Sequence, residues 1–181
     1  MLKNPHNLIR ANFVRACKVH IFIGLAFIAQ VIAYDASKLI TPEVVLKRWI
    51  VAAALVIVAS VCWYIARLND SAQRIHQLAW VLIGADMAVA SFSVYTQRGM
   101  ASRAVLLFVI PILVAATLQR KGAIYLTSIM AAVTYIVTAI AYFVLNFNEG
   151  YKIELYGEIF FYSAMLFAVA GLCWSLVRSK H

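Results

Sequence analysis

One carboxylate stands alone in a long uncharged stretch of this chain. Asp86 lies in the segment "WVLIGADMAVASFSVYT", which runs from 80 to 96 with no other charge. An ionised aspartate at the centre of a membrane helix costs about 2.5–3.5 kcal/mol on insertion scales. Asp86 is therefore either a protonatable or hydrogen-bonding switch, or one half of a structural hydrogen bond between two helices. Gly84 and Ala88 beside it form a small-x-x-x-small pair, which permits close approach of another helix.

The helix of Asp86 offers that carboxylate little help. Its neighbours at helical spacing are apolar, and Ser93, seven residues on, is the polar residue on its face. We therefore expect a partner from another helix. The polar side chains at about the same depth are on the second and fifth apolar segments: Ser60, Thr134, Tyr135 and Thr138.

Two histidines, His20 and His76, lie near matching ends of the first and third apolar segments. Because they share a depth, they could together ligate a haem or a metal ion. The alternative is that both are ordinary histidines at helix ends near the membrane interface. No further ligand set accompanies them in the sequence.

Arg98 and Arg103 bracket the short connection between the third and fourth segments. They could contact an anionic ligand or a lipid headgroup, or pair with Glu154 or Glu158. Alternatively, they are snorkelling cations that extend to the interface.

Two further features lie inside the fourth and fifth apolar segments, away from their ends. Pro111, in the middle of the fourth segment, should kink its helix and release the carbonyl of Leu107, which predicts a hinge or a cavity wall. Tyr135, Thr138 and Tyr142 form a polar-tipped stripe at spacings of three, four and seven. Such a stripe is typical of interhelical packing and hydrogen bonding.

The elements that must position these residues are membrane helices. The 181 residues are 65% hydrophobic and have a mean hydropathy of +0.88, whereas an ordinary soluble domain is about 45–50% apolar. A spanning helix needs about 20 mostly apolar residues. Six segments meet or approach that length and predict an all-α bundle in one domain, 1–181, with helices near 13–34, 49–68, 75–96, 104–118, 123–147 and 158–177.

Charge predicts the orientation of these six helices. Ten of the sixteen Lys and Arg residues fall on the side of the two termini, together with a single acidic residue, Asp70. The other six fall on the opposite side, together with five acidic residues. The positive-inside rule therefore places both termini in the cytoplasm. The longest outer connection, 35–48, is expected to hold a small amphipathic turn or interfacial helix begun by Thr41-Pro42-Glu43.

Several function classes are not supported by any motif. The sequence has no phosphate-binding Gly loop, H-E-x-x-H, nucleophile elbow or C-x-x-C, so no catalytic or metal-binding residue is predicted. The net charge of +9 comes from basic residues in ones and twos, which does not favour nucleic-acid binding. Three widely spaced cysteines predict reduced thiols.

The central segment has a more specific likeness. The stretch "ADMAVASFSVYTQRGMASRAVLLFVIPILVAATLQRKGAIYLTSIMAAVTYI" resembles the six-helix membrane sensor module of certain bacterial histidine kinases, among them quinone-responsive redox kinases and pilus sensor kinases. The likeness covers about 76–140 by motif and the whole chain by topology. The matching positions are Asp86, Tyr95, Gly99, Ser102, Pro111, Gly122 and Tyr135.

The resemblance implies a sensory module of a two-component system in a bacterial inner membrane. It implies a homodimer, and a downstream signalling domain or partner that reads the last helix. The redox kinases carry Asn-Pro-Phe, implicated in quinone sensing, where this chain has Arg98-Gly99 and Ser102-Arg103. Two other functions stay open: a structural or assembly subunit of a larger membrane complex, with a haem on His20 and His76, and a small transporter.

Overall fold

The computed structural model describes residues 5–38, 41–69, 71–97, 102–146 and 152–177. Within these ranges every element is helical and no strand occurs. Five described helices are long and apolar enough to cross a membrane. They are α1 (Pro5–Ala36), α2 (Pro42–Leu68), α3 (Ala72–Thr96), α5 (Lys121–Asn146) and α6 (Lys152–Leu176). The all-helical class is confirmed, whereas six complete spans and their orientation stay predictions.

The start of α2 differs from the expectation. Thr41 is extended, with φ −68° and ψ 149°, and Pro42 follows as the first helical residue. Proline is tolerated there because the first helical N–H has no acceptor within the helix. Glu43 and Lys47 then form an ion pair of 2.6 Å along the first turns. Thr41-Pro42-Glu43 therefore begins a helix as predicted, but the expectation of a separate element within the 35–48 connection is wrong, because this helix is the beginning of α2.

The fourth apolar segment changes its helix type partway. It consists of the 3-10 helix η2 (Arg103–Phe108) and the short helix α4 (Val109–Thr117). Ser102 caps η2, since its hydroxyl accepts a hydrogen bond from the Ala104 N–H at 3.0 Å. Pro111 falls in the first turn of α4, where a missing N–H is harmless. The prediction of an open Leu107 carbonyl is wrong, because the Val109 N–H donates to that oxygen.

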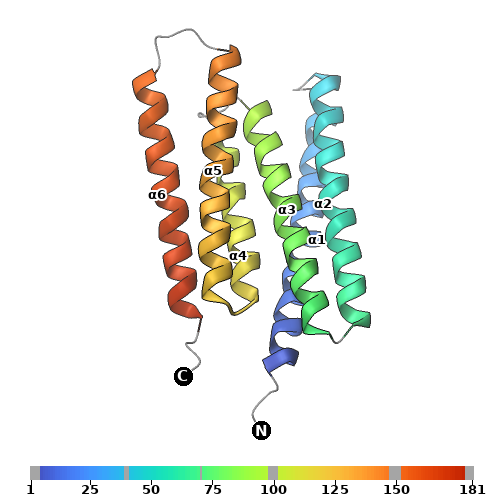
Figure 1. Ribbon diagram of the computed structural model, residues 1–181. Coiled ribbons are helices and arrows are strands. Elements are labelled where there is room, and N and C mark those ends of the chain that lie inside the picture. Colours follow the sequence, from blue (N-terminus) through green and yellow to red (C-terminus); the bar gives the residue numbers. More distant parts are fainter. Residues whose placement is uncertain (1–4, 39–40, 70, 98–101, 147–151, 178–181) are drawn as a thin grey trace. The chain divides into compact units, whose positions relative to one another are not determined.

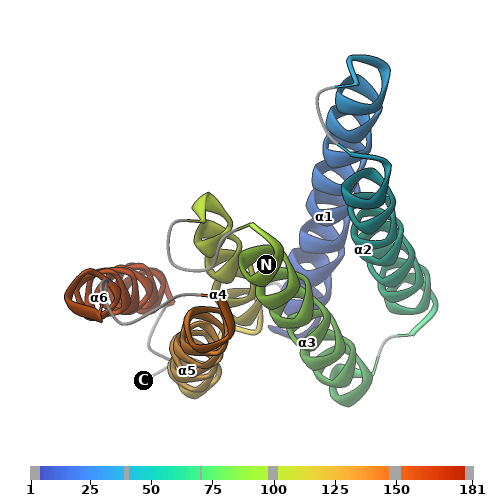
Figure 2. The same cartoon turned by 90° about the horizontal axis from the view of Figure 1, so that it is seen from above.

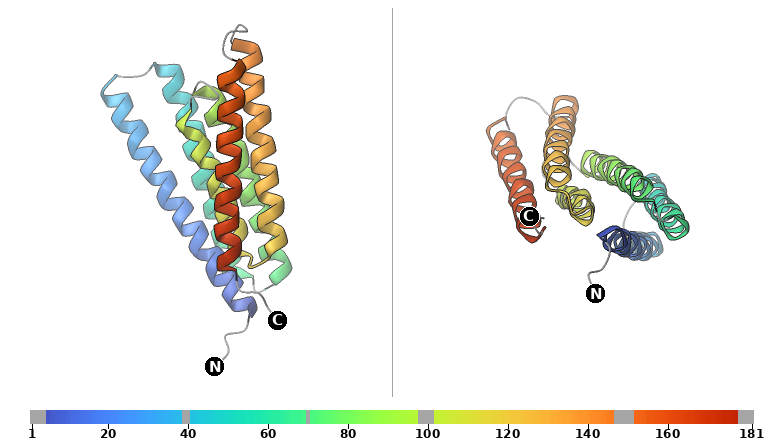
Figure 3. Two further views of the ribbon diagram at one scale, coloured as in Figure 1. Left: turned by 90° about the vertical axis from the view of Figure 1, so that its left-hand side faces the viewer. Right: turned by 60° about the horizontal axis from the view of Figure 1, so that its bottom comes forward.

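The chain divides into two compact units, Met1–Leu82 and Ile83–His181, with the boundary inside α3. In the first unit, α1 and α2 pack along each other and run in opposite directions (Figures 1 and 2). In the second unit, α5 packs against both α4 and α6, and α4 also contacts α6 (Figure 3). The prediction of one domain over 1–181 stays a prediction.

The helices α1 and α2 approach each other closely at a glycine of α1, which faces a valine of α2. A Cβ atom built on Gly24 would lie 2.5 Å from Cγ2 of Val56. At Gly84, by contrast, an added Cβ would meet no atom within 4 Å, and both Gly84 and Ala88 are exposed. Among the described residues the close approach that Gly84 and Ala88 permit is not seen at Gly84 and stays a prediction, whereas a close approach of this kind is found at Gly24.

The described helices expose large apolar side chains on their outer faces. Phe22 of α1 is 72% exposed, and Ile153 and Phe160 of α6 are 88% and 77% exposed. A soluble protein rarely leaves so much apolar surface uncovered. These faces are suited to lipid, in agreement with the expected membrane protein.

Candidate functional site

The centre of the second unit is occupied by one aromatic side chain. Tyr135 of α5 is fully buried and is the largest such side chain in the described chain. Its ring meets Phe108 of η2 edge to face, with 6.1 Å between centroids, and meets Tyr162 of α6 in the same way at 5.9 Å. Edge-to-face contacts of this kind add about 0.5–1.5 kcal/mol beyond area burial. Tyr135 therefore joins η2, α5 and α6 through one continuous ring contact.

The hydroxyl of Tyr135 has a different character from its ring. Within the described residues, Oη is buried and makes no hydrogen bond. On α6, Glu158 lies one helical turn before Tyr162, whose ring contacts the ring of Tyr135. Burying a polar group without a hydrogen bond costs about 1–3 kcal/mol. A group held at that cost is a candidate for a contact made in another state of the protein.

Further polar atoms in this unit are also buried without a hydrogen bond. Thr127 Oγ1 lies on α5, eight residues before Tyr135, and Ser163 Oγ follows Tyr162 on α6. Both atoms belong to helices that the Tyr135 ring connects. The interior of this unit is therefore partly polar as well as aromatic.

The predicted stripe on α5 is confirmed for its two tyrosines as a packing element. Tyr142 meets Tyr95 of α3 edge to face, with 5.6 Å between centroids. Tyr95 itself is 39% exposed, so this contact lies at the margin of the unit. Thr138 behaves differently, because its hydroxyl donates to the Thr134 carbonyl of its own helix at 2.8 Å.

Asp86 lies on the buried face of α3, as its spacing predicts. It is 4% exposed, and Ser93 on the same face is 5% exposed. Asp86 also takes part in at least one polar or electrostatic interaction. A buried carboxylate with an interaction agrees with both interpretations, the switch and the structural bond. Its partner on the second or fifth predicted helix stays a prediction.

The connection between α3 and η2 is described only at its edges. Arg98 and Gly99 lie outside the described residues. Arg103, the first residue of η2, is exposed. Among the described side chains Arg103 forms no ion pair with Glu154 or Glu158, and the pairing expected of Arg98 stays a prediction. Arg103 remains a candidate for contact with a ligand or headgroup.

The two histidines differ in their surroundings. His20 is 6% exposed, and its Nδ1 lies 2.8 Å from the Ala16 carbonyl of its own helix. His76 is partly exposed. The described part of the chain contains no group of three or more His, Cys, Asp or Glu that could hold a metal ion. Haem binding by this pair stays a prediction.

Two residues of the ring contact escaped sequence reasoning. Phe108 follows no polar or periodic signal, because it is one of several apolar residues in its segment. Tyr162 could have been found by counting from the α5–α6 connection, since Tyr135 and Tyr162 lie at similar distances from it. The signal that was missed is that aromatic residues on consecutive helices lie at the same depth when they are equally far from the connection between those helices.

No protein-family model, no curated protein and no solved structure matches this chain. The contacts of its own residues are therefore the basis for assigning a function.

Proposed function

We propose that this chain is a sensory and signal-transducing module embedded in a bacterial inner membrane, with six spans and both termini in the cytoplasm. The observation that carries the proposal is the ring contact from Phe108 through Tyr135 to Tyr162. It connects η2, which follows the outer turn, with α6, the last helix. A displacement at one end has a packed route to the other.

The starting point of the proposed signal is the outer turn. A ligand that binds beside Arg103 changes the position or helix type of η2, which a 3-10 segment allows because its hydrogen bonds have poorer geometry. Phe108 at the end of η2 then moves against Tyr135. Packed cores respond to such a shift by switching between discrete arrangements.

The unpaired Tyr135 hydroxyl supplies a second arrangement. In the structure described here Oη makes no hydrogen bond. In the proposed second state it donates to an acceptor on α6, with Glu158 as the candidate. The hydrogen bond gained would offset part of the energy needed to displace α6.

The last helix is well suited to act as the output. In the most apolar window of α6 only 17% of residues are buried, compared with 44% for α3. A helix with few buried contacts shifts at a lower cost than one enclosed on most sides. A fused domain, a separate partner or a second copy of the chain would read that shift.

The test is a distance measurement between spin labels on the α4–α5 turn and on the end of α6, the proposed output helix. Cysteines introduced at Arg120 and Leu176, in a background without native cysteines, carry the labels, because both positions are exposed. The protein is placed in nanodiscs and exposed in turn to a quinone, a pH step and anionic lipid. A change in the distance distribution with any of these probes is expected. An unchanged distribution under all of them would overturn the proposal.

Three variants sharpen the result. Tyr135→Leu should abolish the distance change, because the ring contact is lost. Tyr125→Leu is the matched control, since Tyr125 is on the same helix but 57% exposed. Asp86→Asn should preserve folding. A changed response in that variant would make Asp86 part of the switch, and an unchanged response would leave it a structural residue.

A further inference from the structure

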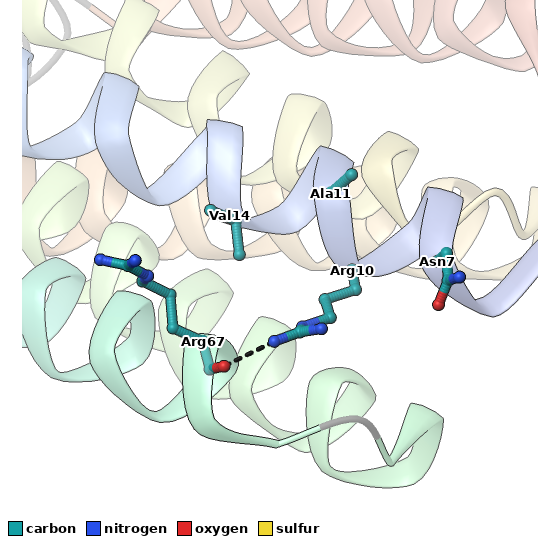
Figure 4. Close-up of a pocket in the computed structure, with 5 residues that line it drawn as sticks. All are labelled: Asn7, Arg10, Ala11, Val14 and Arg67. Atoms are coloured by element: carbon teal, nitrogen blue, oxygen red, sulfur yellow. Dashed lines mark hydrogen bonds between the residues drawn. The ribbon is translucent and has the colours of Figure 1, made fainter.

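A pocket lies in the first unit, where α1 begins and α2 ends. Its volume is about 320 Å³, and its lining residues are Asn7, Arg10, Ala11, Val14 and Arg67. Figure 4 shows Arg10 reaching from α1 to the backbone of Arg67 on α2. These five lining residues include two guanidinium groups and an amide but no carboxylate.

Arg10 is held in a fixed position at the wall of the pocket. Its Nε donates to the Ala66 carbonyl at 3.0 Å, and its Nη2 donates to the Arg67 carbonyl at 2.5 Å. The carbonyls in the last turn of a helix accept no hydrogen bond from within that helix. Arg10 of α1 therefore supplies the donors for the carbonyls at the end of α2. The guanidinium is thus oriented before any ligand arrives.

Arg67 is oriented in a second way. Its guanidinium carbon lies 5.2 Å from the centroid of the Trp63 ring, one turn earlier on α2. A cation above an indole face keeps its charge while its long side chain is restrained. The lining residues therefore carry two restrained guanidinium groups, which point in different directions in Figure 4. A guanidinium suits a phosphate because its N–H groups match the phosphate oxygens.

The depth of the pocket matches that of lipid phosphates. On α2 the uncharged residues 49–66 extend about 27 Å at about 1.5 Å per residue, close to the thickness of about 30 Å of a hydrocarbon core. Arg67 follows directly, so it lies where the headgroups begin. Ala11 and Val14 add an apolar wall that a soluble anion does not need.

We infer that this pocket binds the phosphate group of an anionic phospholipid from the leaflet on the side of the termini. The inference does not depend on the proposed sensory function, because it concerns the other unit. A free phosphate shares the chemistry of the headgroup. The depth and the apolar wall favour the lipid.

The test uses native mass spectrometry of the full chain in detergent, titrated with phosphatidylglycerol and, separately, with phosphatidylcholine. The wild type should bind phosphatidylglycerol about tenfold more tightly. Arg67→Gln should weaken that binding about five- to tenfold, and Arg67→Lys by less, because lysine keeps the charge without the planar fork. Arg67 is exposed, so its substitution leaves folding intact.

The matched control is Arg15→Gln, which removes the same charge from an exposed position on α1 outside the pocket. This variant should retain phosphatidylglycerol affinity within about twofold. Equal losses in the two glutamine variants would overturn the site, as would equal binding of the two lipids. Competition by inorganic phosphate as effective as that by the lipid would replace the lipid with a soluble anion and overturn the assignment.

Discussion

The two units of this chain place their buried polar groups differently. Of the buried polar side chains in the described residues, His20 belongs to the unit Met1–Leu82. The others belong to the unit Ile83–His181: Asp86, Ser93, Ser102, Thr127 and Ser128. The first unit joins two helices through a glycine contact and an arginine at their end. The second unit keeps hydroxyls and a carboxylate inside.

Among the described residues, the first unit has one buried polar atom without a hydrogen bond, Trp63 Nε1, whereas the second has three: Tyr135 Oη, Thr127 Oγ1 and Ser163 Oγ. Interhelical packing through small residues is satisfied in one arrangement and gains nothing from another. A buried hydroxyl without a hydrogen bond has something to gain from rearrangement. We therefore expect substitutions in the first unit to act on stability, and substitutions around Tyr135 to act on stability and state together.

The largest effect is expected at the centre of the second unit. Tyr135→Ala should lower the free energy of unfolding by about 3–5 kcal/mol, because a fully buried ring leaves a cavity between three helical elements. Tyr135→Phe keeps the ring and removes the unpaired hydroxyl, so it should be neutral or stabilising by about 1 kcal/mol. Unfolding by SDS titration in mixed micelles measures both. A loss of more than about 1 kcal/mol in the phenylalanine variant would show that Oη is hydrogen-bonded.

A smaller effect is expected where the first unit is closest. Gly24→Ala should cost about 1–3 kcal/mol, because valine is stiff at χ1 and cannot easily move its Cγ2 from the new methyl group. Val56→Ala in the same protein should recover most of that loss. Gly84→Ala is the matched control and should be neutral or slightly stabilising. Equal losses at the two glycines would contradict the close approach of α1 and α2.

The end of that helix pair should respond less. Arg10→Met keeps an apolar chain of similar length but removes the donors to the Ala66 and Arg67 carbonyls. We expect a loss of about 1.5 kcal/mol. Arg15→Met, at an exposed position on the same helix, should change stability by less than about 0.5 kcal/mol. The same SDS titration compares the two, and similar losses would remove Arg10 from the list of residues that hold α2.

The smallest effects concern the turn between α4 and α5. Gln119 has a φ of 55°, which L side chains other than Asn and Asp adopt at a cost. Gln119→Gly should therefore stabilise the protein by about 0.5 kcal/mol. Gly122→Ala should stabilise it by about 0.5–1 kcal/mol, because Gly122 is helical and an added Cβ meets no atom within 4 Å. Destabilisation by Gly122→Ala would show that this glycine is needed in the turn.

The sequence predicted the helices better than their beginnings. All six apolar segments are helical, but α1 begins at Pro5 and α2 at Pro42, ahead of the predicted residues 13 and 49. Apolar length marks where a helix is inside lipid, whereas a helix continues into the interface as long as its polar residues tolerate it. The predicted ends are therefore closer to the limits of the hydrocarbon core than to the limits of the helices.

Predictions about particular side chains succeeded where the spacing along one helix was enough to make them, and not where a contact with a second helix was needed. The burial of Asp86 with Ser93 followed from spacing along α3 alone. The close approach that Gly84 permits required knowledge of which helix faces it, and among the described residues no atom lies within 4 Å of a Cβ added there. Gly122, one of the positions that carry the resemblance, is helical, and the residue with positive φ between α4 and α5 is Gln119. Spacing fixes a face, and only a neighbouring helix gives that face a contact.

By itself, the sequence determined that this chain is helical and suited to a membrane, because hydropathy and helical periodicity are properties of consecutive residues. The tertiary structure alone decided that Tyr135 meets Phe108 and Tyr162, and that Arg10 holds the end of α2. The physical reason is that lipid solvates every apolar helix face about equally well, so hydropathy does not distinguish one face from another. Which faces pair depends on close packing and on the few hydrogen bonds between helices, and these are set by residues distant in the chain.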